Sequence, residues 1–246
     1  MPLNPLAPVT DYQSMLNRIF WFTTASALAA IWMLRLAVPQ IDVSLSKIDF
    51  AVAMRGDKVF PISGGYLLPA LAIGIATRVF RLHARVSDGL GIRENFDVEV
   101  IISEFAARLA IDLEQVGKEQ LRRARHRIMR KAFYPFVSGP QLHVDQQLIL
   151  QALDAWSWFW VGVEAALVFT LTGFALIACN AYAIGFQTLG GAIFLAVLGL
   201  PAIRSQCKRY AIAQVRAILS DPTRAAAVRT AFDELVGENI NRRLAA

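Results

Sequence analysis

The stretch from Ala155 to Ile203 constrains the fold more than any other part of the chain. Its 49 residues include a single charged one, Glu164. A bilayer core of about 30 Å takes about 20 apolar residues of helix, so this stretch is long enough to cross it twice. The Asn180–Tyr182 segment near its middle supplies a turn. We therefore predict a transmembrane hairpin with spans at Trp156–Ala178 and Ala183–Ile203.

Two earlier apolar runs predict a second hairpin. The first runs from Ile19 to Val38 and carries aromatic residues toward both ends, as expected at the two membrane interfaces. The second runs from Ile62 to Phe80, and its Ala70 and Gly74, four residues apart, permit close contact with another helix. The predicted fold class is an all-α integral membrane protein with four transmembrane helices in two hairpins and a cytoplasmic helical region.

This reading divides the chain into five segments. They are an N-terminal lead (1–16), a first transmembrane hairpin (17–80) with an external loop (40–60), a cytoplasmic helical region (81–154), a second transmembrane hairpin (155–203) and cytoplasmic C-terminal helices (204–246). In the external loop, Ile41, Val43 and Leu45 alternate with polar residues, which predicts a short strand.

The region between the hairpins predicts a long amphipathic helix that Asn95 or Asp97 caps. Its apolar residues recur at spacings of three and four and continue less regularly to Ile128. The stripe consists of Val98, Ile102, Phe105, Leu109, Leu113 and Val116. Toward the C-terminus, the helix of the fourth span is expected to continue to Leu219, and a last helix to run from Pro222 to Gly237.

The distribution of Lys and Arg predicts the orientation. Segment 81–154 carries eleven and segment 204–246 carries eight, against three in the loop at 40–60. Basic residues gather on the cytoplasmic side of membrane proteins. We expect a multi-pass protein of a bacterial inner membrane with both termini in the cytoplasm. The net charge of +6 then needs no nucleic-acid partner.

No motif for catalysis or for a cofactor stands out. His83, His126 and His143 lack neighbours at metal-ligand spacing, and no phosphate-binding loop or nucleophile elbow is present. Asp112 and Glu114 fit the solvated face of a helix. The chain is expected to be no enzyme and to hold neither a metal nor another cofactor.

Glu164 is the strongest single candidate for a functional residue. A carboxylate inside a membrane costs free energy and usually faces a partner or a water-filled cavity. By depth, Arg78 near the cytoplasmic end of the second span is its expected partner. Glu164 either lines a pore or responds to protons, or it forms a structural contact that locks the bundle.

A basic cluster lies at 122–131 and has three interpretations. It binds anionic lipid, or it binds a soluble anion or nucleic acid, or it is a solvated face. Aromatic residues beside it favour lipid, and no aromatic interleaving for stacking on single strands accompanies it. The cluster consists of Arg122, Arg123, Arg125, Arg127, Arg130 and Lys131.

Directly after the second span stands the segment Arg93-Glu94-Asn95-Phe96-Asp97. This patch and the order of spans resemble the four-transmembrane effectors associated with bacterial cyclic-nucleotide antiphage systems. The resemblance implies a membrane-disrupting effector that is triggered from the cytoplasm. Under it, Arg93, Glu94, Phe96 and Asp97 are candidates for contact with a signal or a partner.

Two functions follow as expectations. The first is a non-enzymatic oligomeric pore or effector that its cytoplasmic helices control. The second is a scaffold or accessory subunit that binds a partner helix, in the membrane or the cytoplasm, through the stripe from Val98 to Ile128. A small transporter is a third option, but the four spans show no convincing internal repeat.

Overall fold

The computed structural model describes residues 6–48, 64–113, 116–138 and 144–244, and side chains as far as residue 234. Over these residues every regular element is a helix, which confirms the all-α prediction. The chain divides into two compact units. Unit 1 comprises 1–84 and 154–204, and unit 2 comprises 85–153 and 205–246.

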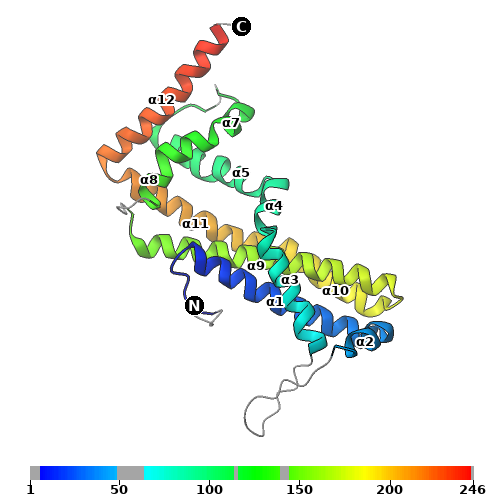
Figure 1. Ribbon diagram of the computed structural model, residues 1–246. Helices are drawn as coiled ribbons and strands as arrows, with labels where there is room; N and C mark the ends of the chain where they lie inside the picture. Colours follow the sequence, from blue (N-terminus) through cyan, green and yellow to red (C-terminus); the bar gives the residue numbers. More distant parts are fainter. Residues whose placement is uncertain (1–5, 49–63, 114–115, 139–143, 245–246) are drawn as a thin grey trace. The chain divides into compact units, whose positions relative to one another are not determined.

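Three helices are long and apolar enough to cross a membrane (Figure 1). They are α1 (Tyr12–Ala37), α9 (Gln146–Ala178) and a continuous helix, Tyr182–Leu219, made of α10 (Tyr182–Phe194), the π-helical turn η3 (Leu195–Gly199) and α11 (Leu200–Leu219). A fourth span is formed if the bent pair α3 (Gly64–Val79) and α4 (Leu82–Gly89) counts as one. Their length and composition are those of a multi-pass membrane protein.

The bend of 54° between α3 and α4 falls at Phe80 and Arg81, where Arg81 has a φ of +48°. Helix α3 itself continues through Pro69. The strand predicted at Ile41–Leu45 is wrong, because Pro39 starts a helix, α2 (Pro39–Ser46). Proline at the first helical position has a preset φ and lacks only an N–H group that would be unpaired anyway. Residues 49–60 of that loop lie outside the described residues.

Small residues bring the helices of unit 1 together. Ala27 on α1 and Ala70 on α3 are fully buried, and a Cβ built on Gly74 would lie 2.1 Å from Thr24 Oγ1. Ala70 and Gly74 therefore make the close contact predicted for them. At the second hairpin, α9 and α10 lie side by side (Figure 1), and a Cβ on Gly185 would lie 3.1 Å from the Gly173 carbonyl oxygen.

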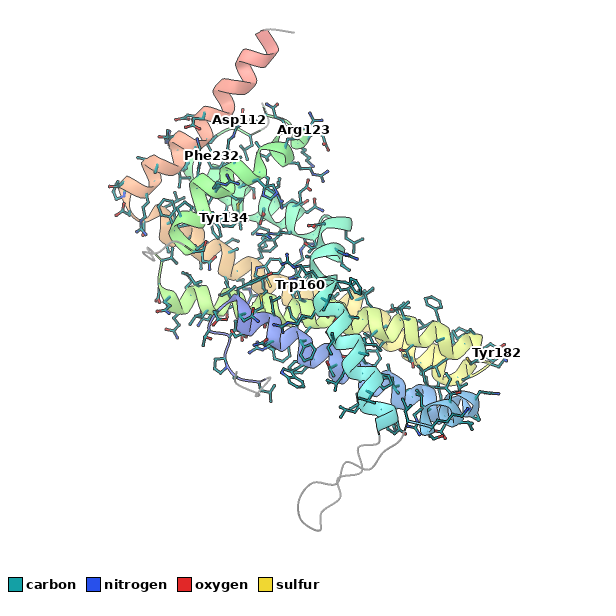
Figure 2. The ribbon with its side chains drawn as sticks, in the orientation of Figure 1. Asp112, Arg123, Tyr134, Trp160, Tyr182 and Phe232 are labelled. Carbon is teal, nitrogen blue, oxygen red and sulfur yellow. The ribbon has the colours of Figure 1, made fainter. Side chains whose placement is uncertain are left out.

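The core of unit 2 is aromatic and aliphatic. Phe105 stands on α6 (Ser103–Leu109), Phe133 at the end of the π-helical turn η2 (Met129–Phe133), and Phe232 on α12 (Pro222–Leu244), which Figure 2 labels. The Phe105 ring lies 6.4 Å from each of the other two rings. Three segments distant in the sequence thus meet at one buried residue.

The predicted single helix of this region is interrupted. It begins at Ile92 with α5 (Ile92–Phe96), capped by Gly91 rather than by Asn95 or Asp97, and continues through the π-helical turn η1 (Asp97–Ile102) and α6. It ends at Ala110, which has a φ of +53°. Asp112 consequently lies outside any helix, and Glu114 lies outside the described residues.

A second helix, α7 (Lys118–Ile128), follows the break and continues through η2 into α8 (Tyr134–Val137). Much of the apolar stripe is buried inside unit 2, which leaves little of it for a partner helix. The buried members are Ile102, Phe105, Val116, Leu121, Ala124 and Ile128.

Of three predictions for the C-terminal helices, two are confirmed and one is wrong. The fourth span does continue to Leu219, and α12 does begin at Pro222. The predicted end at Gly237 is wrong, because α12 runs to Leu244. A glycine inside a helix costs about 1 kcal/mol relative to alanine, which a long helix can absorb.

Candidate functional site

The Glu164 side chain is buried inside unit 1, with 1% of its surface exposed. Thr23 Oγ1 on α1 donates a hydrogen bond of 2.5 Å to Glu164 Oε2. His83 Nδ1 on α4 lies 4.0 Å from Glu164 Oε1. The His83 ring also meets the edge of Trp160, which Figure 2 labels on α9, at 6.1 Å between centroids. We call Glu164, Thr23 and His83 the carboxyl site.

The carboxyl site holds an acid without a guanidinium or ammonium partner among the described residues. A hydroxyl both donates and accepts, so Thr23 can serve a charged or a protonated Glu164. His83 can accept a proton or donate one, according to its own charge state. The site therefore places two groups that can each carry a proton 4.0 Å apart on different helices.

The predicted pairing of Arg78 with Glu164 is wrong. Arg78 Nη1 donates to Asn17 Oδ1 at 2.8 Å, and its guanidinium lies 5.9 Å from the centre of the Phe20 ring. Both partners stand on α1, nearer its N-terminus than Thr23. Helix depth alone placed Arg78 near the acid, but the side chain extends toward α1.

A buried arginine forms a second polar site in unit 1. Arg18 is 4% exposed, and its Nη1 donates to Asp154 Oδ1 at 2.6 Å and to Ser157 Oγ at 2.7 Å. Its Nη2 donates to the carbonyl oxygen of Ala7 at 2.8 Å. The guanidinium also lies 5.0 Å from the centre of the Trp158 ring. Arg18 thus ties the N-terminal lead and α1 to α9.

In unit 2 the structure brings together the segment Arg93–Asp97 and the basic cluster, which are separated in the sequence. Arg125 Nη1 lies 3.2 Å from Asp97 Oδ2, and both side chains are nearly buried. Arg122 Nη2 donates to Asn95 Oδ1 at 3.1 Å. The helix that begins at Ile92 is thereby joined to α7.

Further contacts extend this junction. The Arg122 Nε lies 3.6 Å from Glu94 Oε1, and Arg93 Nη2 donates to the Tyr134 hydroxyl at 3.0 Å. Lys131 pairs with Glu234 of α12. Much of the basic cluster therefore serves pairs inside unit 2.

The electrostatics of the junction are uneven. Burial raises the pKa of the Asp97 carboxyl from its ordinary value of 3.8 to about 6, against the opposing effect of the Arg125 and Arg93 guanidinium groups. The positive charge of Arg125 beside His126 lowers the pKa of that imidazole. A buried, ion-paired acid that titrates near neutral pH results.

Two of the residues predicted to contact a signal are not available at the surface. Phe96 is 2% exposed and Asp97 is 6% exposed, so both belong to the interior of unit 2. Arg93 is exposed and Glu94 is partly so. No group of three His, Cys, Asp or Glu residues within the described ranges is placed to hold a metal ion.

Sequence reasoning missed Thr23, His83 and Arg18. Thr23 is one of several hydroxyl residues in an apolar run, and His83 has no polar neighbour in the sequence that marks it as functional. No spacing within the sequence could reveal Thr23 and His83, because the three helices that meet at Glu164 are far apart in the sequence. Arg18 did carry a signal, since a charge beside a span, seven residues after the possible cap Asp11, points to a polar partner on another helix.

Comparison with known proteins identifies the family of this chain. No curated protein and no solved structure matched the chain. A model of the YmfE protein family matches residues 11–234, which include the carboxyl site, Arg18 with its partners on α9, and the junction of unit 2. This match provides no link to the antiphage effectors that the patch at Arg93–Asp97 resembles. The chain belongs to the YmfE protein family.

Proposed function

We propose that this protein is a gated, non-enzymatic conducting component of a bacterial inner membrane, and that the carboxyl site is its gate. In the closed state the Thr23 hydroxyl holds Glu164 against α1. When α1 and α9 separate, water enters, the Glu164 carboxyl group gives its proton to that water, and the resulting carboxylate lines a path for ions or protons. Association of several copies through the exposed apolar surfaces of the spans is part of this proposal.

The proposal is based mainly on the burial of Glu164. A carboxyl group in an apolar bundle costs free energy that an apolar residue would not, and such residues mark ion and proton pathways in membrane proteins. Arg18 and Arg35 are buried too, but each is paired with a carboxylate, at 2.6 Å to Asp154 and 2.7 Å to Asp42. Of the buried charged residues that the structure describes, Glu164 alone has a neutral hydroxyl as its nearest polar partner.

Unit 2 is the proposed controlling element. The division between the units falls inside α4, α9 and α11, so each connection is a continuous helix rather than a flexible linker. A movement within unit 2 would be transmitted along these helices to unit 1. The excess of Lys and Arg in unit 2 supports a cytoplasmic location for it and for both termini.

The antiphage resemblance suggests one biological setting, in which a signal opens the gate and depolarises an infected cell. A scaffold function is less favoured, because much of the apolar stripe that would bind a partner helix is covered inside unit 2. A partner would have to use another surface.

Expression at controlled levels in a bacterium, with membrane potential followed by a fluorescent dye, tests the gate without its natural trigger. Thr23→Val removes the hydroxyl, and Thr23→Ser keeps it. We expect Thr23→Val to depolarise the cells and Thr23→Ser to match the wild type. Equal behaviour of the two variants, at equal amounts of protein in the membrane, would contradict a gate at this site.

A further inference from the structure

Helix α7 has two faces of opposite character. Leu121, Ala124 and Ile128 are buried in unit 2. Arg123, Arg127 and Arg130 are exposed. Arg123 and Arg127 stand on α7, and Arg130 follows in η2, which continues the helix. Positions three or four residues apart lie on one side of a helix, and this side points away from the buried face. The three arginines therefore form one continuous basic face.

Three other residues of the basic cluster form ion pairs inside unit 2. Arg122, Arg125 and Lys131 lie within ion-pair distance of Glu94, Asp97 and Glu234, respectively. Arg123 and Arg130, by contrast, make no ion pair with any residue that the structure describes. Figure 2 shows Arg123 on the side of α7 that faces away from α12. The cluster thus consists of an internal set and an outward set.

The occupant of the outward set follows from charge and from chain connectivity. Three guanidinium groups on one face suit phosphate oxygens, which they bind through several parallel hydrogen bonds. Unit 2 is joined to the candidate spans through three helices without an intervening linker, so phosphate-bearing headgroups are always present at high local concentration. A soluble polyanion has no such advantage.

We propose that the face formed by Arg123, Arg127 and Arg130 binds the headgroups of anionic phospholipids. This contact fixes α7 at the membrane surface. Because Arg125 of α7 is paired with Asp97, lipid binding also influences the helix that begins at Ile92. The lipid site does not depend on the gate at Glu164. A protein without a conducting path would still bind lipid through this face.

The test uses the full-length protein, purified in a neutral detergent and titrated with short-chain phosphatidylglycerol or phosphatidylcholine, with binding followed by native mass spectrometry. Each basic residue near an anionic surface contributes a factor of about five to binding. The double variant Arg123→Gln/Arg130→Gln should therefore bind phosphatidylglycerol about thirtyfold more weakly, and phosphatidylcholine unchanged.

The matched control is Lys118→Gln/Arg216→Gln, which removes the same charge from exposed positions of unit 2. We expect it to bind phosphatidylglycerol like the wild type. Hydrogen exchange of residues 92–109 in neutral detergent reports whether each variant keeps the fold of unit 2.

Three results would overturn the proposal. An equal loss in both double variants would mean that net charge alone attracts the lipid. Unchanged binding in the Arg123→Gln/Arg130→Gln variant would exclude this face as the site. If an RNA oligonucleotide bound the wild type and not that variant, while phosphatidylglycerol bound both equally, the face would serve nucleic acid instead.

Discussion

Among the residues that the structure describes, each unit buries one carboxyl group, and the two groups are stabilised differently. Asp97 of unit 2 faces the permanent charge of Arg125 at 3.2 Å. Glu164 of unit 1 faces the neutral hydroxyl of Thr23 at 2.5 Å and His83 at 4.0 Å. A guanidinium keeps its charge at any ordinary pH, whereas a hydroxyl and an imidazole allow the acid either charge state.

This difference separates a structural site from a candidate functional one. An ion pair between two nearly buried residues joins α7 to the helix that begins at Ile92, and neither group can leave without exposing the other to an apolar interior. In the carboxyl site, loss of one partner leaves no unpaired opposite charge. Its acid can change charge without leaving an opposite charge unpaired, which a gate requires.

Loss of the cation in unit 2 should have the largest effect. At a pH well above 6, where Asp97 is ionised, Arg125→Gln leaves the Asp97 carboxylate buried without its partner, and breaking a buried pair in this way costs about 3 kcal/mol or more. Hydrogen exchange of residues 92–109 in the purified protein measures the loss. Arg108→Gln, which breaks the partly exposed pair with Glu104, should cost less than about 1 kcal/mol. Similar costs for both would mean that the Asp97 pair is not buried in solution.

The pH dependence of unit 2 should come next. The pKa of Asp97 is raised from 3.8 to about 6, so the folded state holds this proton more tightly than the unfolded state does. Between these values the contribution of Asp97 to stability therefore increases as the pH falls, and it is lost as the pH rises through about 6. The change is on the order of 2–3 kcal/mol. Hydrogen exchange of residues 92–109 across this range, corrected for the intrinsic rate, should show it in the wild type and not in Asp97→Asn.

Loss of the hydroxyl in unit 1 should cost less than loss of the cation in unit 2. Thr23→Val removes one hydrogen bond to Glu164 and leaves a carboxyl group that can protonate, at a cost of about 1–2 kcal/mol. Thermal unfolding in detergent measures it, with Thr23→Ser as the control that keeps the hydroxyl. A cost as large as that of Arg125→Gln would remove the contrast between the two sites.

The smallest change in stability is expected for Glu164→Gln. The amide oxygen still accepts from Thr23 and no ion pair is lost, so the variant should unfold within about 1 kcal/mol of the wild type. The same thermal unfolding measures it. A loss of about 3 kcal/mol would instead show that Glu164 and a protonated His83 form a buried ion pair.

The sequence was most informative where structure depends on local composition. Apolar runs of about 20 residues predicted the spans, and the break at Ser220–Pro222 predicted the start of α12. It failed where one local pattern fits two structures, as in the alternation of Ile41 to Leu45, which lies in helix α2. The end of the helix at Ala110 is set by a positive φ that alanine rarely adopts, so composition gives no sign of it.

The candidate site was predicted only in part for a related reason. Burial cost singled out Glu164 from the sequence, because one charge in 49 apolar residues is conspicuous. Its partners depend on which faces of α1, α4 and α9 meet, and that is decided by packing of small residues such as Ala70 and Gly74. Depth along a helix pointed to Arg78, but it does not specify direction around the helix.

Ion flux through liposomes that contain only the purified protein tests the proposed gate most directly. Four proteins are compared at equal incorporation: the wild type, Thr23→Ser, Thr23→Val and Thr23→Val/Glu164→Gln. We predict that Thr23→Val liposomes leak, that the first two remain tight, and that adding Glu164→Gln abolishes the leak. A leak that persists without the Glu164 carboxylate, or tight liposomes with Thr23→Val, would contradict a path gated at Glu164.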